Sequence, residues 1–64
     1  MTRDAAIRKA KRLARETGTT HYVIVDFDDC GNTVYHVADE EAMNTFYFAF
    51  EADLAVEPDG VVSR

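Results

Sequence analysis

Two segments rich in β-branched and aromatic residues, separated by a short polar stretch, constrain the fold of this chain more than any other feature. Residues 20–27 and 33–38 have the composition typical of strands, because such side chains pack well on a pleated surface. Residues 28–32 contain aspartate, glycine and asparagine, which favour turns. The sequence therefore predicts an antiparallel β-hairpin. A hairpin alone is at best marginally stable in water, so the remaining segments must cover it.

An amphipathic pattern predicts a helix over residues 3–16. Its apolar side chains recur at helical spacing: Ala6, Ile7, Ala10, Leu13 and Ala14. Thr2 suits the N-cap position, and Gly18 suits the C-terminal stop. The opposite side of this helix is basic and carries Arg8, Lys11, Arg12 and Arg15.

The segment after the second strand is compatible with two structures. Asp39 is a good N-cap and acidic residues follow it, so we predict a helix over 39–50 and a strand over 52–57. Every second residue from Phe46 to Val56 is also apolar, as it would be in a strand. The alternative is a single helical turn followed by one long strand from residue 45.

Residues 1–64 are thus expected to form one α+β domain with the element order α-β-β-α-β. We expect an antiparallel three-stranded sheet with both helices packed on one face. The predicted core consists of apolar side chains from every element: Ile7, Leu13, Val23, Val25, Phe46 and Phe50. The last residues, 61–64, would either add a short strand or fray.

The size of the chain and its single cysteine restrict the classes of protein to consider. Cys30 is the only cysteine, which excludes an intrachain disulfide and fits a reducing cytoplasm. No apolar run approaches the ~20 residues of a membrane span, and the charged N-terminus is unlike a signal peptide. A domain of 64 residues has little room for a deep catalytic cleft. We therefore expect a cytoplasmic protein that is not an enzyme.

The hairpin turn partly matches the residue pattern of a calcium-binding loop. Asp26, Asp28 and Gly31 match the first, third and sixth positions of such a loop. The twelfth position, where a bidentate glutamate is needed, is Val37. We therefore interpret this segment as an acidic turn and expect no calcium site.

Zinc binding and cysteine chemistry would both require residues to converge. His21 and Cys30 fall at opposite ends of the first predicted strand and its turn, and His36 lies well down the second strand. Asp28 and Asp29 beside Cys30 would oppose the thiolate that nucleophilic catalysis needs. We expect no metal, no cofactor and no catalytic residue.

The net charge of −5 conceals a strong asymmetry. Residues 1–17 carry six basic and two acidic side chains, whereas residues 18–64 carry one basic and ten acidic side chains. The acidic residues include two clusters, which we take as the candidate partner-binding site: Asp26, Asp28 and Asp29, then Asp39, Glu40 and Glu41. Carboxylates spread over a small rigid body can imitate the phosphates of a nucleic acid. Solubility alone is the simpler interpretation of the same charges.

Aromatic residues are numerous for so small a core, and some are candidates for exposed anchors that contact a partner. They are Tyr22, Tyr35, Phe46, Tyr47, Phe48 and Phe50.

A short acidic α+β chain with an Asp-rich hairpin, which ends shortly after Glu57-Pro58-Asp59-Gly60, is similar in style to the anti-CRISPR proteins of phages and mobile elements. The resemblance rests on size, charge and element order, and it carries over no functional residue. It implies a protein that binds a CRISPR effector complex at a basic surface and blocks target DNA.

The expected function is therefore binding to a basic protein surface, with inhibition of a nucleic-acid-handling complex. The main alternative is a nucleic-acid-binding or regulatory module that uses the basic face of the first helix, although the overall acidity opposes approach to a polyanion. A third possibility is an interaction domain whose charges serve only solubility.

Overall fold

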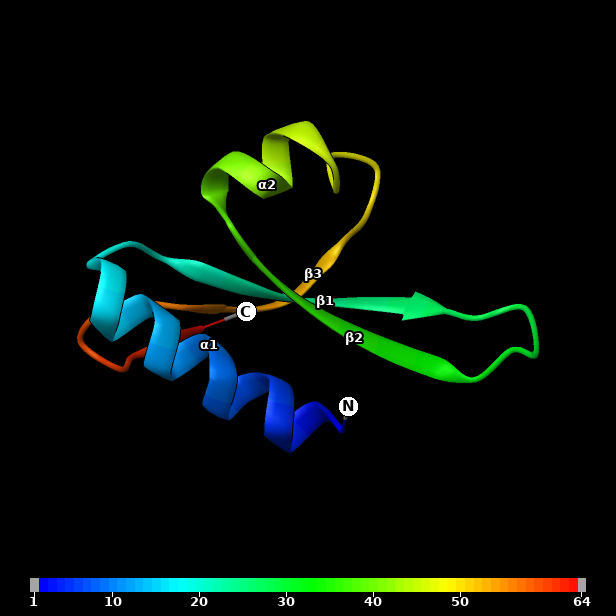
Figure 1. Ribbon diagram of the computed structural model, residues 1–64, viewed down its shortest axis with the longest axis horizontal. Helices are drawn as coiled ribbons and strands as arrows, with labels where there is room; N and C mark the ends of the chain where they lie inside the picture. Colours follow the sequence, from blue (N-terminus) through cyan, green and yellow to red (C-terminus); the bar gives the residue numbers. More distant parts are fainter. Residues whose placement is uncertain (1, 64) are drawn as a thin grey trace.

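The computed structural model describes residues 2–63 and shows a four-stranded antiparallel sheet with two helices (Figure 1). In chain order the elements are α1 (Arg3–Thr17), β1 (His21–Phe27), β2 (Thr33–Asp39), α2 (Glu40–Thr45), β3 (Ala52–Val56) and β4 (Val62–Ser63). The strand order in the sheet is β2-β1-β3-β4. The predicted α+β class and the order α-β-β-α-β are confirmed, and the C-terminal residues add β4 as a fourth, two-residue strand.

Helix α1 begins and ends at the predicted capping residues. The Thr2 side chain accepts a hydrogen bond from the Ala5 backbone N–H at 3.1 Å. Gly18 adopts the left-handed conformation, with φ of 70°, and its N–H donates to the Ala14 carbonyl at 2.9 Å. Both contacts satisfy backbone groups that a helix end otherwise leaves without a partner.

The core lies where α1 crosses the sheet. Three fully buried alanines of the helix pack against buried residues of β1 and β3, and the cluster comprises Ala6, Ala10, Ala14, Val23, Leu54 and Val56. Because alanine side chains are small, the helix axis can approach the strands closely. The predicted core residue Val23 is confirmed, whereas Ile7 is half-buried against this cluster, and Leu13 and Val25 are half-buried outside it.

The hairpin has the predicted position. β1 and β2 pair over their whole length, from His21 opposite Asp39 to Phe27 opposite Thr33. In the turn, Asp28 N–H donates to the Asn32 carbonyl at 3.0 Å, and Gly31 adopts a φ of 82° that favours glycine.

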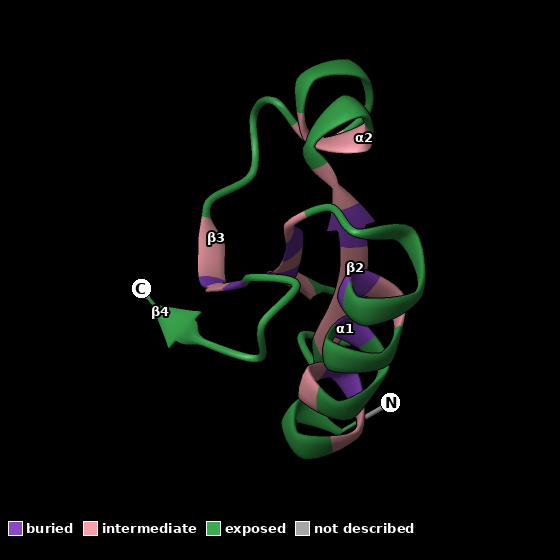
Figure 2. Ribbon diagram, turned by 90° about the vertical axis from the view of Figure 1, so that its left-hand side faces the viewer, coloured by how far each residue is buried: buried purple, intermediate pink, exposed green. Residues whose placement is uncertain are grey.

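The second helix is shorter than predicted. α2 ends at Thr45, and residues 46–50 form turns and bends, so neither the helix to residue 50 nor the long strand from residue 45 is observed. The chain has to reverse there in order to bring β3 beside β1, and this reversal ends the helix. The placement of Phe46 and Phe50 in the core was wrong, because their side chains are 75% and 38% exposed on these turns. In Figure 2 this region is almost entirely exposed, whereas the buried residues lie in α1 and the strands.

The two helices lie on opposite sides of the strands (Figure 1). α1 covers the face that carries Val23 and its partner Val37. Neighbouring residues of a strand point to opposite faces, so His36 points away from α1. The ring of Tyr47, just after α2, packs on His36 with 5.6 Å between ring centroids. α1 therefore packs on one face of the sheet and the segment after α2 covers part of the other face, so the two helices do not share one face as expected.

No helix within residues 2–63 is long and apolar enough to cross a membrane.

Candidate functional site

The structure separates the six predicted site residues into two groups. Asp28 and Asp29 lie at the hairpin tip with Asp26 near the end of β1, and Asp39, Glu40 and Glu41 lie where β2 meets α2. The seven-residue strand β2 runs between them, a path of about 20 Å at the usual rise per residue. The six carboxylates therefore do not form one patch.

Asp28 organises the hairpin turn. Its carboxylate accepts hydrogen bonds from the backbone N–H groups of Cys30 and Asn32, at 2.9 and 2.8 Å, and from the Asn32 side-chain amide at 3.4 Å. The bond from the Asn32 backbone, assisted by the others, lowers the pKa of Asp28. This carboxylate is thus occupied in holding the turn, in the manner of an Asx-turn.

Two further aspartates also have structural partners. Asp39 is the N-cap of α2 and accepts a hydrogen bond from the Ala42 N–H at 2.8 Å. Asp26 accepts one from the Phe27 N–H at 2.7 Å and lies 3.4 Å from the Nε2 atom of His36. Only three of the six candidate residues are left as exposed carboxylates without a hydrogen bond or ion pair to any residue of the range 2–63: Asp29, Glu40 and Glu41.

The exposed phenylalanines were predicted only in part: Phe46 was placed in the core, although Phe46 and Phe48 were also candidates for exposed anchors. Phe27, Phe46 and Phe48 are 65%, 75% and 77% exposed. A signal for this was available in the sequence, because residues 46, 47 and 48 are consecutive and aromatic. Consecutive side chains on a helix point to different sides, so they cannot all face one core.

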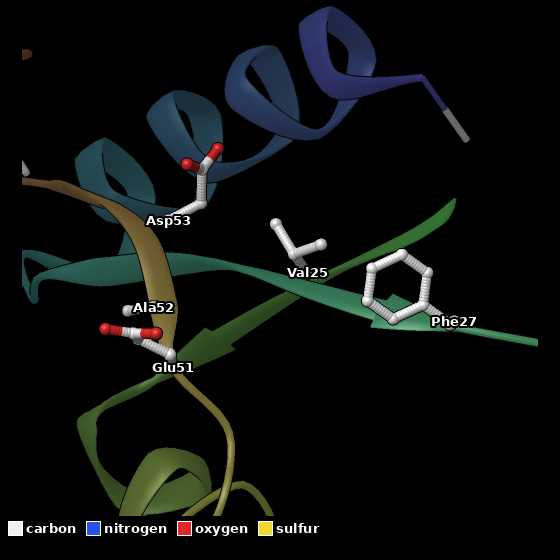
Figure 3. A pocket seen from close by; sticks show the side chains of 5 residues that line it. All are labelled: Val25, Phe27, Glu51, Ala52 and Asp53. Atoms are coloured by element: carbon white, nitrogen blue, oxygen red, sulfur yellow. The ribbon is translucent and has the colours of Figure 1, made fainter. Parts of the chain in front are cut away.

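An open groove of ≈ 640 Å³ lies between the end of β1 and the start of β3 (Figure 3). Its lining consists of Val25, Phe27, Glu51, Ala52 and Asp53. We refer to these five residues as the β1–β3 groove. None of the five groove residues was among the six predicted site residues, because the groove depends on how β3 pairs with β1.

A β-bulge shapes this groove. The register of β1 and β3 shifts between Val23 and Ile24, whose partners are Leu54 and Ala52, so Asp53 is the extra residue. In Figure 3 the Asp53 carboxylate points toward α1, and there it accepts a hydrogen bond from Arg3 Nε at 2.9 Å. The hydrogen bond and charge of Asp53 raise the pKa of Arg3.

The basic side chains of α1 lie on its outer side, as the periodicity indicates. Arg8, Lys11, Arg12 and Arg15 are all exposed. Arg12 Nε lies 4.0 Å from a Glu16 carboxylate oxygen, a distance at which an exposed pair contributes little. This basic face of α1 is therefore accessible to solvent and to any acidic partner.

The residues considered for metal binding do not converge. His21 is buried at the start of β1, with its Nδ1 atom 3.1 Å from the Thr19 carbonyl. Cys30 is exposed at the hairpin turn, and His36 lies beside Asp26. Within residues 2–63, no three histidine, cysteine or acidic side chains are grouped so that they could hold a metal ion.

Comparison of the chain with known protein families, with curated proteins and with solved structures finds no match.

Proposed function

We propose that this protein binds another protein and inhibits a nucleic-acid-handling complex by covering a basic surface, the role that the resemblance to anti-CRISPR proteins implies. The observation that carries the proposal is the exposure of Phe46 and Phe48, at 75% and 77%. Large aromatic side chains that remain outside the core of so small a domain are typical anchors of protein interfaces.

Charge supports a basic partner. Glu40 and Glu41 are exposed in the first turn of α2, and the phenylalanines follow directly after the same helix. We call Glu40, Glu41, Phe46 and Phe48 the α2 surface. Aromatic anchors would contribute most of the affinity, and the carboxylates would accelerate association with a positively charged surface.

The proposal is tested by a gel-shift assay with purified, guide-loaded CRISPR effector complexes and labelled target DNA. Rising concentrations of the protein should progressively abolish DNA binding by a complex that it inhibits. The double variants Phe46→Ala/Phe48→Ala and Glu40→Lys/Glu41→Lys should each require about tenfold more protein. The charge variant should also be less sensitive to salt.

Control variants make similar changes elsewhere, in which an apolar side chain is shortened to alanine or a glutamate is replaced by lysine. Val61→Ala and Glu57→Lys alter exposed residues near β4 and should inhibit like the wild type. The proposal is wrong if no complex is inhibited, or if the α2 surface variants and the controls behave alike.

The basic face of α1 supports a second candidate, direct nucleic-acid binding. Arg8, Lys11 and Arg15 are exposed and form no ion pair with any residue between 2 and 63. The same gels without an effector complex distinguish the two functions. A DNA or RNA shift by the protein alone, lost in Arg8→Glu/Lys11→Glu/Arg15→Glu, would favour this candidate over inhibition.

A further inference from the structure

The β1–β3 groove lies where β1 continues beyond its neighbour. β3 pairs with β1 only from His21 to Ile24, whereas β2 pairs with β1 as far as Phe27. The last three residues of β1 therefore have a strand on one side only. An open strand edge is a template for pairing with another chain.

The backbone of β1 presents hydrogen-bonding groups to this groove. In an antiparallel pair, alternate residues direct both N–H and C=O to the same neighbour. Asp28 N–H donates to Asn32 at the end of the β1–β2 ladder, so Asp26 also faces β2, and Val25 and Phe27 face the groove. The Phe27 N–H already donates to the Asp26 carboxylate at 2.7 Å, so the Phe27 carbonyl and the backbone groups of Val25 are those left to face an added strand.

The side chains of the groove are apolar along β1. Val25 and Phe27 project toward the same side of the strand in Figure 3, with Phe27 65% exposed. A strand laid beside β1 would bring one of its own side chains against each of them. Burial of these two side chains would thus accompany the backbone pairing.

The opposite wall of the groove is acidic. Asp53 already holds a guanidinium group, that of Arg3, at 2.9 Å. Glu51 is exposed and has no hydrogen bond or ion pair to any other residue within 2–63. The carboxylate of Glu51 therefore favours a lysine or arginine next to the apolar side chains of an incoming segment.

We propose that the β1–β3 groove binds an extended, basic segment of a protein partner by strand addition beside Val25–Phe27. Apolar side chains of the segment pack on Val25 and Phe27, and an adjacent lysine or arginine pairs with Glu51. The identity of the partner rests on the proposed function, whereas the strand addition itself does not.

The probe is a short fluorescent peptide of alternating valine and arginine, with binding measured by anisotropy. One comparison peptide alternates valine and glutamate. A second keeps the valine–arginine sequence but carries N-methyl groups at alternate backbone nitrogens, which removes the donors needed for strand pairing. We expect the first peptide alone to bind, and the exchange of the Val25 amide proton with solvent to slow in its presence.

Two variants locate the binding site. Phe27→Ala and Glu51→Lys should each weaken peptide binding by about tenfold, because they remove an anchor and reverse the selecting charge. Both residues are exposed, so circular dichroism should show an unchanged fold. Val61→Ala and Glu57→Lys are the matched controls and should bind with wild-type affinity.

Equal binding of the N-methylated peptide would overturn strand addition, and equal binding by the controls and the groove variants would overturn the site. This result is separable from the inhibition assay. Peptide binding at the groove without inhibition of any effector complex contradicts the proposed function alone. Inhibition that survives Phe27→Ala, with no peptide binding, contradicts the groove proposal alone.

Discussion

At the hairpin tip, one carboxylate determines the geometry of several backbone groups. Asp28 accepts hydrogen bonds from Cys30 and Asn32, which fixes the path between β1 and β2. Asp39 similarly starts α2 by accepting the Ala42 N–H. An aspartate in a turn or at a helix start thus has two interpretations, a charge offered to a partner or an acceptor for the backbone. The sequence does not distinguish them, because both need the same side chain at the same place.

The pH dependence of folding should reveal this role of Asp28. Its pKa is lower in the folded chain than in the unfolded chain, so the unfolded state takes up the proton first as the pH falls. The stabilisation is therefore present above the ordinary carboxyl pKa of about 3.9 and is lost as the pH falls through the folded-state value. We expect Asp28→Asn to lower the melting temperature at neutral pH, and the difference from the wild type to shrink toward pH 3.

Melting temperatures from circular dichroism across this pH range test the prediction. Asp29→Asn is the control, because Asp29 is exposed and its carboxylate has no hydrogen bond to residues 2–63. Equal effects of the two substitutions would show that Asp28 contributes only its charge.

Among the elements, α1 and the hairpin could be predicted closely and α2 could not. The caps of α1 and the turn of the hairpin are local signals, which act within a few residues and need no partner. The end of α2 depends on where the chain must turn to bring β3 beside β1, and this is a contact between distant segments. The bulge at Asp53 and the groove beside it have the same non-local origin.

The packing of α1 on the sheet gives a prediction at this scale. Ala10 is fully buried between the helix and the strands. Ala10→Leu should lower the free energy of unfolding by about 1–3 kcal/mol, because added methylenes force the closely packed helix and sheet apart. Urea denaturation followed by circular dichroism measures the change.

Lys9→Leu is the matched substitution on the exposed side of α1, and it should change the free energy of unfolding by less than about 0.5 kcal/mol. A similar loss in both variants would mean that leucine acts on the helix itself and not on its packing.

As a whole, the molecule is extended, with dimensions of 35 × 24 × 18 Å, and its surface is divided between different chemistries. Basic residues lie along the outer side of α1, whereas carboxylates and phenylalanines gather on α2, the following turns and the hairpin. The charge division was predictable from the sequence, because it follows from where the residues lie along the chain. The sequence also indicates that some aromatic side chains are exposed, but which of them are exposed depends on how much sheet is available to cover.

Limited digestion with chymotrypsin, which cuts after aromatic residues, tests whether the phenylalanines after α2 are exposed. Exposed turns are the preferred sites of proteolysis, so the first cut should fall after Phe46 or Phe48. Phe46→Ala/Phe48→Ala should slow this cut without changing the urea midpoint. First cleavage after Tyr22 or Tyr35, which lie within paired strands, would instead indicate that the whole domain opens.

The position of these turns also links binding to the lifetime of the chain. A cut after Phe48 would separate β3, which supplies Leu54 and Val56 to the core, from the rest of the protein. Without that strand, the buried face of α1 loses much of its cover, and the remaining fragment would unfold and be degraded. A partner seated on the α2 surface would shield the same bonds from proteases. The amount of this protein in a cell would then follow the amount of its partner, because copies without a partner would be removed.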